Sequence, residues 1–363
     1  IRSLGAVKKV INKVNKKITD IYQINVKQLI TQALVNPLVN LLIIIPISCI
    51  LLVGGMQLNN NVVTIGTLTS FIIFTVQLIT PILSVSSIFI NLKKSAGITY
   101  RITKILYYPN TDNDKDKKVL TKIDSISLSR VSFDYQNNQV LHNISFNINA
   151  GEYVAIIGPS GSGKSTLLKL IDGLYHTKHG ELLINTLPIN QYSEESIHKE
   201  IGFVTQNSML FNGTIKENLL LGVDNKIPDS ELYKQLKLVG LYDYIKKLPK
   251  QLDTPLGELG NTLSEGQKQR LALARVLIRN NDTLLCDEIT SNLDKSNATI
   301  INNCLDVLHT KQDKTIINIT HRLENLNKFD KIIFLVNGQI NGIGSNRNLL
   351  VNNKAYREFV EHK

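Results

Sequence analysis

The feature that most constrains the fold is a glycine-rich segment of eight residues, GPSGSGKS, at positions 158–165. A short apolar run, Tyr153–Ile157, precedes it and has the composition of a buried parallel strand. A glycine-rich loop between a strand and a helix predicts an α/β domain built on a parallel sheet. The helix is predicted from apolar residues at helical spacing after the loop, which are Leu167, Leu168, Leu170, Ile171 and Leu174.

The same segment fills the pattern G-x-x-x-x-G-K-[ST] completely. Its glycines allow backbone N–H groups to wrap around phosphate oxygens, and Lys164 can reach the outer phosphates. The hydroxyl of Ser165 is a suitable ligand for Mg²⁺. We therefore expect a nucleotide to bind here together with its metal ion.

Two further apolar runs end in polar side chains, TLLCDE at 283–288 and TIINITH at 315–321. The carboxyl ends of parallel strands face the ligand crevice, so Asp287 is expected to hold the Mg²⁺ shell. Glu288 is placed to polarise an attacking water, and His321 to contact the terminal phosphate or orient that water. These short patterns are common, so the prediction depends on their order and on the apolar runs before them.

A helix start is predicted in NTLSEGQKQR, residues 261–270. Ser264 and Gln267 have the spacing of a capping box, and an apolar run with helical spacing follows. Such a start attracts anions, because unpaired N–H groups and the helix dipole point the same way. An ordinary capped surface helix has the same pattern, so the pattern alone leaves open whether a phosphate binds here.

The net charge of +11 is concentrated near the N-terminus. Residues 1–27 carry seven Lys/Arg and one Asp, and residues 93–104 carry four Lys/Arg and no acid. Between Lys27 and Lys93 the sequence has no Asp, Glu, Lys, Arg or His. Two basic clusters around an uncharged stretch are typical of the positive-inside rule, with both flanks cytoplasmic. This placement argues against a nucleic-acid partner.

The uncharged stretch divides at LNNN, residues 58–61, and we expect two membrane helices, at about 38–57 and 62–92. The segment 38–56 gives roughly 28 Å of helix, about the thickness of a bilayer core. The second gives roughly 46 Å, so one end should extend beyond the lipid. A buried soluble hairpin is the alternative, which the absence of charge disfavours. The cysteines show no metal-ligand spacing and are expected to be reduced thiols: Cys49, Cys286 and Cys304.

From about Ile126 to the C-terminus, the sequence resembles the nucleotide-binding domain of the ABC transporter superfamily. Tyr135 in VSFDY resembles the aromatic residue that stacks on adenine. Gln206 resembles the glutamine-loop residue that senses the metal and couples to the membrane part, and His321 resembles the switch histidine. LSEGQ matches the family signature except at Glu265, where glycine is usual, and SNLD resembles the D-loop.

The N-terminal part resembles the fifth and sixth membrane helices of a bacterial ABC exporter, and the likeness is greatest to homodimeric multidrug exporters. In that family six helices precede the ATPase domain, so we expect the chain to be a C-terminal portion of a half-transporter. The expected organisation is a partial transmembrane domain at 1–106, a linker at 107–122 and the ATPase domain at 123–363.

The resemblance implies an α/β P-loop ATPase domain, with a RecA-like core, a helical subdomain and an antiparallel β subdomain, preceded by an all-α transmembrane portion. It implies ATP and Mg²⁺ as ligands and a multi-pass protein of the bacterial cell membrane, with the ATPase domain in the cytoplasm. In the family, each ATP lies between the P-loop of one ATPase domain and the signature of its partner. A homodimer, or a heterodimer with a related half-transporter, with two composite ATP sites is therefore expected.

The residues that the resemblance assigns form five groups. The catalytic residues expected are Glu288, His321, Lys164 and Gln206. The ATP-binding residues expected are Tyr135, Gly158, Pro159, Ser160, Gly161, Ser162, Gly163, Lys164, Ser165 and Thr166. The metal ligands expected are Ser165, Gln206 and Asp287. The signature residues, expected to act on the partner's ATP, are Leu263, Ser264, Glu265, Gly266 and Gln267, and the D-loop residues are Ser291 and Asp294.

Other interpretations fit the sequence less well. A soluble ABC-type ATPase that acts on ribosomes or DNA lacks membrane spans, and the basic residues here flank an uncharged stretch. A catalytically inactive half of a heterodimer is expected to lose Glu288 or His321, and both are present. For the transported molecule, drugs or other amphipathic small molecules are the first choice. A bacteriocin or other peptide, or a lipid, is the alternative.

Overall fold

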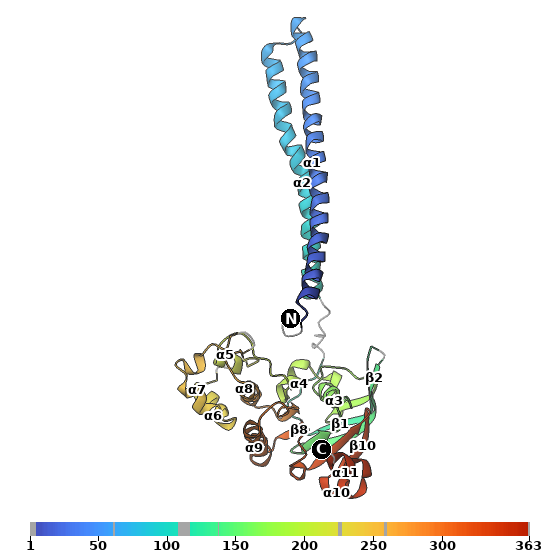
Figure 1. Cartoon of the computed structure of the whole chain (residues 1–363), viewed down its shortest axis with the longest axis vertical. Coiled ribbons are helices and arrows are strands. Elements are labelled where there is room, and N and C mark those ends of the chain that lie inside the picture. The colour runs from blue at the N-terminus through green and yellow to red at the C-terminus, as the bar shows by residue number, and fades with distance from the viewer. Residues whose placement is uncertain are drawn as a thin grey trace. The chain divides into compact units, whose positions relative to one another are not determined.

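The computed structural model describes residues 5–60, 62–107, 117–136, 138–223, 227–257 and 260–361. It divides into two compact units, Ile1–Asn110 and Thr111–Lys363. The first unit is a helical hairpin, and the second contains the β-sheets and the shorter helices (Figure 1).

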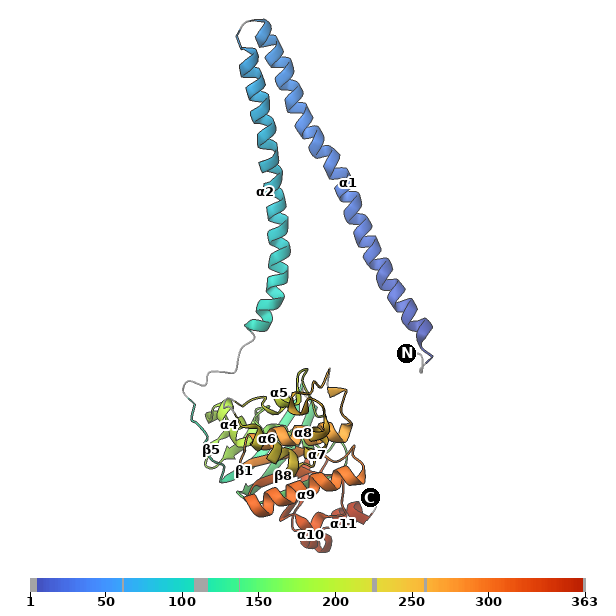
Figure 2. The ribbon, with the colours of Figure 1, turned by 90° about the vertical axis from the view of Figure 1, so that its left-hand side faces the viewer.

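The described part of the first unit consists of two long helices, α1 (Val7–Asn59) and α2 (Ile65–Leu106). They are antiparallel, and the distance between them grows away from the loop that joins them (Figure 2). Thr64 caps α2, because its hydroxyl accepts a hydrogen bond from the N–H of Thr67 at 3.3 Å. Both helices are longer than the predicted spans, since the basic segments at either side, rich in helix-forming Lys and Arg, continue them.

Large apolar side chains of the hairpin are exposed, among them Ile18, Leu29 and Phe74 at 58, 63 and 64%. Within the described part of the chain, no helix combines the length and the apolar character that crossing a membrane requires. The spans expected at about 38–57 and 62–92 stay predictions.

A six-stranded sheet forms the centre of the second unit. β10 pairs with β9 in antiparallel fashion, and the other neighbouring strands are parallel. The runs predicted as buried strands from residues 153, 283 and 315 are confirmed, since each is buried along its whole length. The spatial order is β10 (Gln339–Gly344), β9 (Lys331–Val336), β3 (Tyr153–Ile157), β8 (Thr315–Ile319), β7 (Thr283–Asp287) and β6 (Ile201–Val204).

A four-stranded sheet packs beside the P-loop helix. Its order is β2 (Asn138–Asn149), β1 (Ser125–Tyr135), β4 (His179–Ile184) and β5 (Leu187–Pro188), all antiparallel. Leu128 and Ile148 of this sheet share one hydrophobic core with Leu167 and Leu170 of α3 (Lys164–Ile171). This contact brings the end of β1 close to the start of α3.

The helices α5 to α8 gather at one side of the second unit (Figure 1) and are called the helical subdomain below. Their buried side chains share a core with α9 and β7. With the parallel core and the antiparallel sheet, this arrangement confirms the predicted fold class. The remaining bounds are α4 (Glu194–Glu200), α5 (Ile215–Leu219), α6 (Asp229–Leu238), α7 (Tyr242–Lys247), α8 (Glu265–Ile278), α9 (Lys295–Gln312), α10 (Asn346–Asn352) and α11 (Lys354–Glu361).

The P-loop helix is shorter than its apolar pattern predicts. α3 ends at Ile171, with Asp172 as its C-cap, and Gly173 follows with φ of 80°. Glycine adopts this left-handed conformation readily and ends the helix. Leu174, which the pattern placed on the buried face, is instead 54% exposed.

Candidate nucleotide site

Three adjacent parallel strands bring three of the four predicted catalytic residues to one edge of the sheet. β7 lies between β6 and β8. Gln206 comes two positions after β6, Glu288 directly follows β7, and His321 comes two positions after β8. The carboxyl ends of these strands therefore hold all three side chains, as expected of a ligand crevice in an α/β sheet.

The Glu288 carboxylate contacts both of the other side chains. Gln206 Nε2 donates to Glu288 Oε2 at 3.0 Å, and His321 Nε2 lies 2.5 Å from Oε1. The side chains of Glu288 and His321 are 16 and 25% exposed, so this contact is largely shielded from water. Shielding strengthens hydrogen bonds to a charged group. A carboxylate held in this way can act as a general base towards water.

Glu288 has a left-handed backbone conformation, with φ of 50°. A non-glycine residue adopts it only at an energetic cost. Its N–H donates to the Ile319 carbonyl at 3.2 Å, and its carbonyl accepts from the Ser291 N–H at 3.0 Å and hydroxyl at 2.8 Å. These contacts stabilise the turn, and such strain is typical of functional positions.

The P-loop, residues 158–163, is supported by close backbone contacts. A Cβ at Gly158 would lie 1.9 Å from the Leu335 carbonyl oxygen, so only glycine fits. The Gly338 N–H, in the turn between β9 and β10, donates to the Ser162 carbonyl at 3.2 Å. At Gly161, where φ is 78°, a Cβ would meet no described atom within 4 Å, so this side of the loop is open.

The polar groups of the P-loop fit the phosphates of a nucleotide. The Ser162 hydroxyl is buried and has no hydrogen-bond partner among the described residues. The first N–H groups of α3 have no acceptor inside the helix, because of helix geometry. These donors and the helix dipole together form a site for an anion.

Lys164 places a cation at this loop. Its side chain is largely buried, with the residue 4% exposed, and Nζ donates to the carbonyls of Gly158 at 3.0 Å and Pro159 at 2.8 Å. A buried ammonium group needs such partners. The loop's own backbone therefore supplies acceptors for the predicted phosphate-binding cation.

Ser165 and Asp287 provide a donor set that fits Mg²⁺. The Ser165 hydroxyl donates to Asp287 Oδ1 at 2.9 Å. Burial and then the neighbouring Glu288 charge raise the pKa of Asp287, which the Ser165 hydrogen bond opposes. Mg²⁺ commonly takes one or two protein carboxylates together with phosphates and waters. Among the described residues, no group of three His, Cys, Asp or Glu side chains is placed to hold a metal.

Tyr135 ends β1 beside the first turn of α3 and is 36% exposed. Its ring is perpendicular to those of Phe133 and Tyr175, with centroids 4.9 and 5.4 Å away. Its hydroxyl lies 3.5 Å from the Thr166 hydroxyl. These neighbours fix the ring while part of it stays open for stacking.

The predicted helix start at Ser264 is confirmed as the N-cap of α8. Ser264 Oγ accepts from the Gln267 N–H at 3.3 Å, and Gln267 Oε1 accepts from the Ser264 N–H at 2.9 Å. The Glu265 side chain is 56% exposed and lies 3.7 Å from Lys268 Nζ. Both ends of the capping box therefore lie within the signature itself.

The other signature and D-loop residues pack locally. Leu263 packs against the core of the helical subdomain, and a Cβ at Gly266 would lie 2.9 Å from the Asn297 side chain of α9. Asp294 is the N-cap of α9 and accepts from the Asn297 N–H at 3.2 Å. The Asn297 side chain thus lies beside both Gly266 of the signature and Asp294 of the D-loop.

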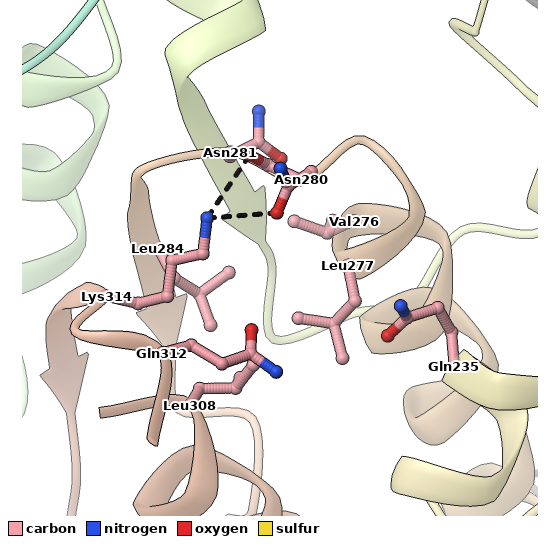
Figure 3. A pocket seen from close by; sticks show the side chains of 9 residues that line it. All are labelled: Gln235, Val276, Leu277, Asn280, Asn281, Leu284, Leu308, Gln312 and Lys314. Atoms are coloured by element: carbon pink, nitrogen blue, oxygen red, sulfur yellow. Dashed lines mark hydrogen bonds between the residues drawn. The ribbon is translucent and has the colours of Figure 1, made fainter. Parts of the chain in front are cut away.

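A small cavity of about 40 Å³ lies between the helical subdomain and α9 (Figure 3). At its rim, Lys314 Nζ donates to the carbonyl and side-chain oxygens of Asn280, at 3.3 and 3.1 Å. It shares no lining residue with the predicted site, and we attribute it to imperfect packing between helices. It is lined by Gln235, Val276, Leu277, Asn280, Asn281, Leu284, Leu308, Gln312 and Lys314.

Two family models match separate parts of the sequence. Residues 141–291 match the ABC transporter model, and residues 1–82 match the ABC transporter transmembrane region. The chain belongs to the ABC transporter family. The first match contains the P-loop, Gln206, the signature and Glu288, so this ABC chain carries an ATPase domain. The second match marks the hairpin as part of a membrane region.

Similar proteins support this assignment. Two proteins of Lactococcus lactis, from strains MG1363 and IL1403, are named multidrug resistance ABC transporter ATP-binding and permease protein. Each is 33% identical over 371 aligned positions, which cover 100% of this ABC chain and 61% of the relative. A solved bacterial Atm1-family ABC exporter with ATP bound is 30% identical, with a TM-score of 0.80, and the match covers 89% of this chain and 56% of that one. This ABC chain thus spans about three fifths of its curated relatives.

Two residues that the sequence analysis missed lie against the site. Tyr175 packs on Tyr135, with ring centroids 5.4 Å apart, and its interaction with the Tyr135 side chain raises the pKa of Tyr175. Arg322 donates to the Leu293 carbonyl of the D-loop at 2.7 Å. The signal for Arg322 is its position directly after His321; for Tyr175 it is an aromatic shortly after the P-loop helix.

Proposed function

We propose that this ABC chain binds ATP with Mg²⁺ at the P-loop and hydrolyses it, and that hydrolysis drives efflux of a substrate across the bacterial cell membrane. The observation that supports it most is the Glu288 carboxylate held by Gln206 and His321 beside the Ser165–Asp287 pair. The site therefore contains a candidate base, a pair of metal ligands and the cation Lys164. Phosphoryl transfer requires groups of these three kinds.

Each group has a defined task in the proposed reaction. Lys164 stabilises negative charge on the outer phosphates. Ser165 and Asp287 would hold Mg²⁺, which when bound neutralises phosphate charge. Glu288 accepts the proton of the attacking water, while Gln206 and His321 keep its carboxylate in place. Tyr135 stacks on the adenine ring of ATP.

The exchange of Glu288→Gln tests this proposal, because it keeps the shape of the side chain and removes the base. We expect ATP to bind while hydrolysis falls by about a hundredfold or more, as for other general bases. Phosphate release and binding of a fluorescent ATP analogue measure the two effects. The matched control is Glu231→Gln on α6, where the carboxylate pairs with Lys234. Hydrolysis near the wild-type rate in the Glu288 variant would show that Glu288 is not the general base.

We further propose that two copies of the protein, or one copy with a related half-transporter, complete two composite ATP sites. The support is the capped, exposed start of α8, which is suited to a phosphate but whose cap contacts remain within the signature. Ser264 and Gly266 would then bind the γ-phosphate held by the partner's P-loop. The membrane helices at about 38–57 and 62–92 would carry the basic clusters on the cytoplasmic side.

For the transported substrate we propose drugs or other amphipathic small molecules, because the Lactococcus lactis relatives are named for multidrug resistance. Stimulation of ATP hydrolysis by added compounds tests this in the transporter reconstituted in lipid vesicles. Selective stimulation by amphipathic drugs supports the proposal. Selective stimulation by peptides, or by one class of lipid, would instead identify that class as the transported substrate.

A further inference from the structure

The loop that carries Gln206, residues 205–211, is anchored by side chains of the helical subdomain. Asn218 of α5 donates from Nδ2 to the Phe211 carbonyl at 2.9 Å and accepts from the Phe211 N–H at 2.8 Å. Arg275 of α8 donates to the Met209 carbonyl at 3.1 Å. After β6 ends, the backbone of the loop no longer pairs with a neighbouring strand. Its carbonyl and N–H groups bond to side chains of α5 and α8 instead.

Gln269 of α8 holds this loop at two further points. Its Nε2 donates to the Thr205 carbonyl at 3.2 Å, and its Oε1 accepts from the Ser208 hydroxyl. One amide group therefore holds the backbone just before Gln206 and a side chain just after it. Gln269 is only 3% exposed, so the loss of these partners would leave a buried amide unsatisfied.

The same helix begins with the signature. Ser264 caps α8, and Gln269 lies in its second turn, so a short rigid element joins the two. At the other end of the loop contact, Gln206 donates to the Glu288 carboxylate at 3.0 Å. The cap of α8 is thus linked to the candidate base in three steps. The helix backbone leads to Gln269, the Gln269 hydrogen bonds lead to the loop backbone, and the Gln206 side chain leads to Glu288.

We propose that Gln269 is a positioning residue that sets Gln206 against Glu288 by holding the loop on both sides of Gln206. This role rests on the proposed ATP hydrolysis at Glu288. In this role Gln269 acts through its contacts with Thr205 and Ser208 of the loop. Displacement of α8 then changes the contact between Gln206 and the base, so the position of the signature helix is passed to the chain's own catalytic carboxylate.

A plain packing role for Gln269 makes different predictions. Burial of an amide in the core of the helical subdomain would affect the stability of the whole subdomain, and its loss would act independently of Gln206. A positioning role confines the effect to the loop and makes it depend on Gln206. Double-mutant cycles separate these cases, because independent effects on a rate multiply and coupled effects do not.

The first measurement uses backbone amide exchange and does not depend on activity. In the purified full chain, Gln269→Met keeps the length of the side chain and removes both hydrogen bonds. We expect faster exchange at residues 205–211, with little change in α6, α7 and the six-stranded sheet. Gln235→Met on α6 is the matched control, since Gln235 donates to Glu231 at 2.8 Å outside the loop. Unchanged exchange in the loop would overturn the proposal.

The second measurement is ATP hydrolysis in a cycle with Gln206→Ala. Gln269→Met is expected to lower kcat about five- to tenfold with little change in KM, the size expected for a lost positioning hydrogen bond. In the Gln206→Ala background, the same exchange should have less than a twofold further effect. Losses that multiply across the two backgrounds would show that Gln269 does not act through Gln206.

Two further results complete the test. Ser208→Ala removes only the hydrogen bond between Ser208 and Gln269, so kcat should fall by less than in Gln269→Met. This variant leaves Gln269 in place and keeps the test usable if Gln269→Met proves unstable. Equal kcat values for this variant and the wild type, with a folded protein, would contradict the proposal. If the wild-type chain does not hydrolyse ATP, the proposed function fails, and amide exchange still decides whether Gln269 anchors the loop.

Discussion

The two halves of the candidate nucleotide site are built in opposite ways. The P-loop half is buried and internally bonded, with Lys164 at 4% exposure and the loop supported by the β9–β10 turn. The signature half is a helix start at the surface, where Ser264 is exposed and the Glu265 side chain is 56% exposed. Its polar groups are satisfied by their own capping box.

The difference indicates which half carries the groups for the chemistry and which half depends on a ligand brought to it. The P-loop half has a cation bound to its own backbone, a hydrogen-bonded metal-ligand pair, and a base held by Gln206 at the carboxyl edge of the sheet. The signature half has the N–H groups of a helix start, and its nearby charges, Glu265 and Lys268, pair with each other. A capped, exposed helix start contributes to a site only when a ligand is brought to it. The predictions below test this contrast in order of decreasing effect.

The largest effect is expected at the buried cation. Lys164→Ala removes the positive charge of the P-loop half, and ATP binding should weaken by about a hundredfold or more, because a charge-assisted contact to phosphate is lost in a buried site. Binding of a fluorescent ATP analogue measures it. Lys234→Ala, which removes an exposed cation from α6, should leave binding unchanged. Equal affinities for both variants would show that the buried cation is not needed.

The next effect depends on the partner. Ser264→Ala should abolish hydrolysis in a dimer of identical chains, because both composite sites lose their signature hydroxyl. A mixed dimer of Ser264→Ala with Lys164→Ala should keep one intact site, since each chain supplies the half that the other lacks. Phosphate release from differentially tagged mixed dimers measures this.

The matched control for the mixed dimer is a chain with both exchanges paired with a wild-type chain. It contains the same two changes, yet each composite site has one damaged half, so we expect no intact site. Equal activity of the two mixed dimers would contradict the composite-site proposal.

A third effect concerns a buried carboxyl group at the C-terminal end of the P-loop helix. Burial raises the pKa of Asp172, the C-cap of α3, from 3.8 to about 7, although Arg279 partly opposes this, and His198 lies 3.8 Å away. The folded protein therefore holds a proton that the unfolded chain releases. This contribution to stability is full below the unfolded pKa and is lost as the pH rises through the folded pKa.

The exchange Asp172→Asn mimics the protonated carboxyl and should remove this pH dependence. Relative to wild type, we expect the variant to gain about 1–4 kcal/mol of stability between pH 4 and pH 8, on the scale of a pKa shift of this kind. Thermal unfolding across this pH range measures it. A constant difference between the two proteins would exclude Asp172 as the titrating group.

The smallest effect is expected in the exposed half. Glu265→Gly removes a carboxylate that is favoured by the helix dipole by typically 0.3–1 kcal/mol and that would lie near a triphosphate. Because the side chain is exposed and paired with Lys268, maximal ATP hydrolysis should stay within about threefold of wild type. Any change in apparent ATP affinity should shrink as salt is raised. A loss of activity that is independent of salt would assign Glu265 a direct role.

Local patterns predicted the parts of the site that depend on local structure. The P-loop, the strands β7 and β8, and the Ser264 cap are each encoded within a few neighbouring residues. Parallel strands then place their ends at one edge, which is why Asp287 and Glu288 could be assigned before the structure was known. Gln206 was assigned from the family resemblance, and the structure brings it to Glu288.

The remaining features depend on packing between distant segments. Nothing near Gln269 in the sequence indicates that its amide reaches Thr205 and Ser208 in another loop. The helices of the hairpin extend beyond the predicted membrane spans: α1 begins at Val7 and continues through Pro37 and Pro46. The predicted bounds followed the change from charged to uncharged residues, and a helix does not end where charge begins.

The position of β3 has a consequence for the order in which the protein can form during synthesis. This strand, which leads into the P-loop, lies between β8 and β9, and the loop rests on the turn that contains Gly338. β8, β9 and this turn all follow β3 by more than 150 residues in the sequence, so they leave the ribosome long after it. The nucleotide cradle therefore cannot take its final form until these later segments have emerged, and a nascent chain gains the ability to bind phosphate only after that point.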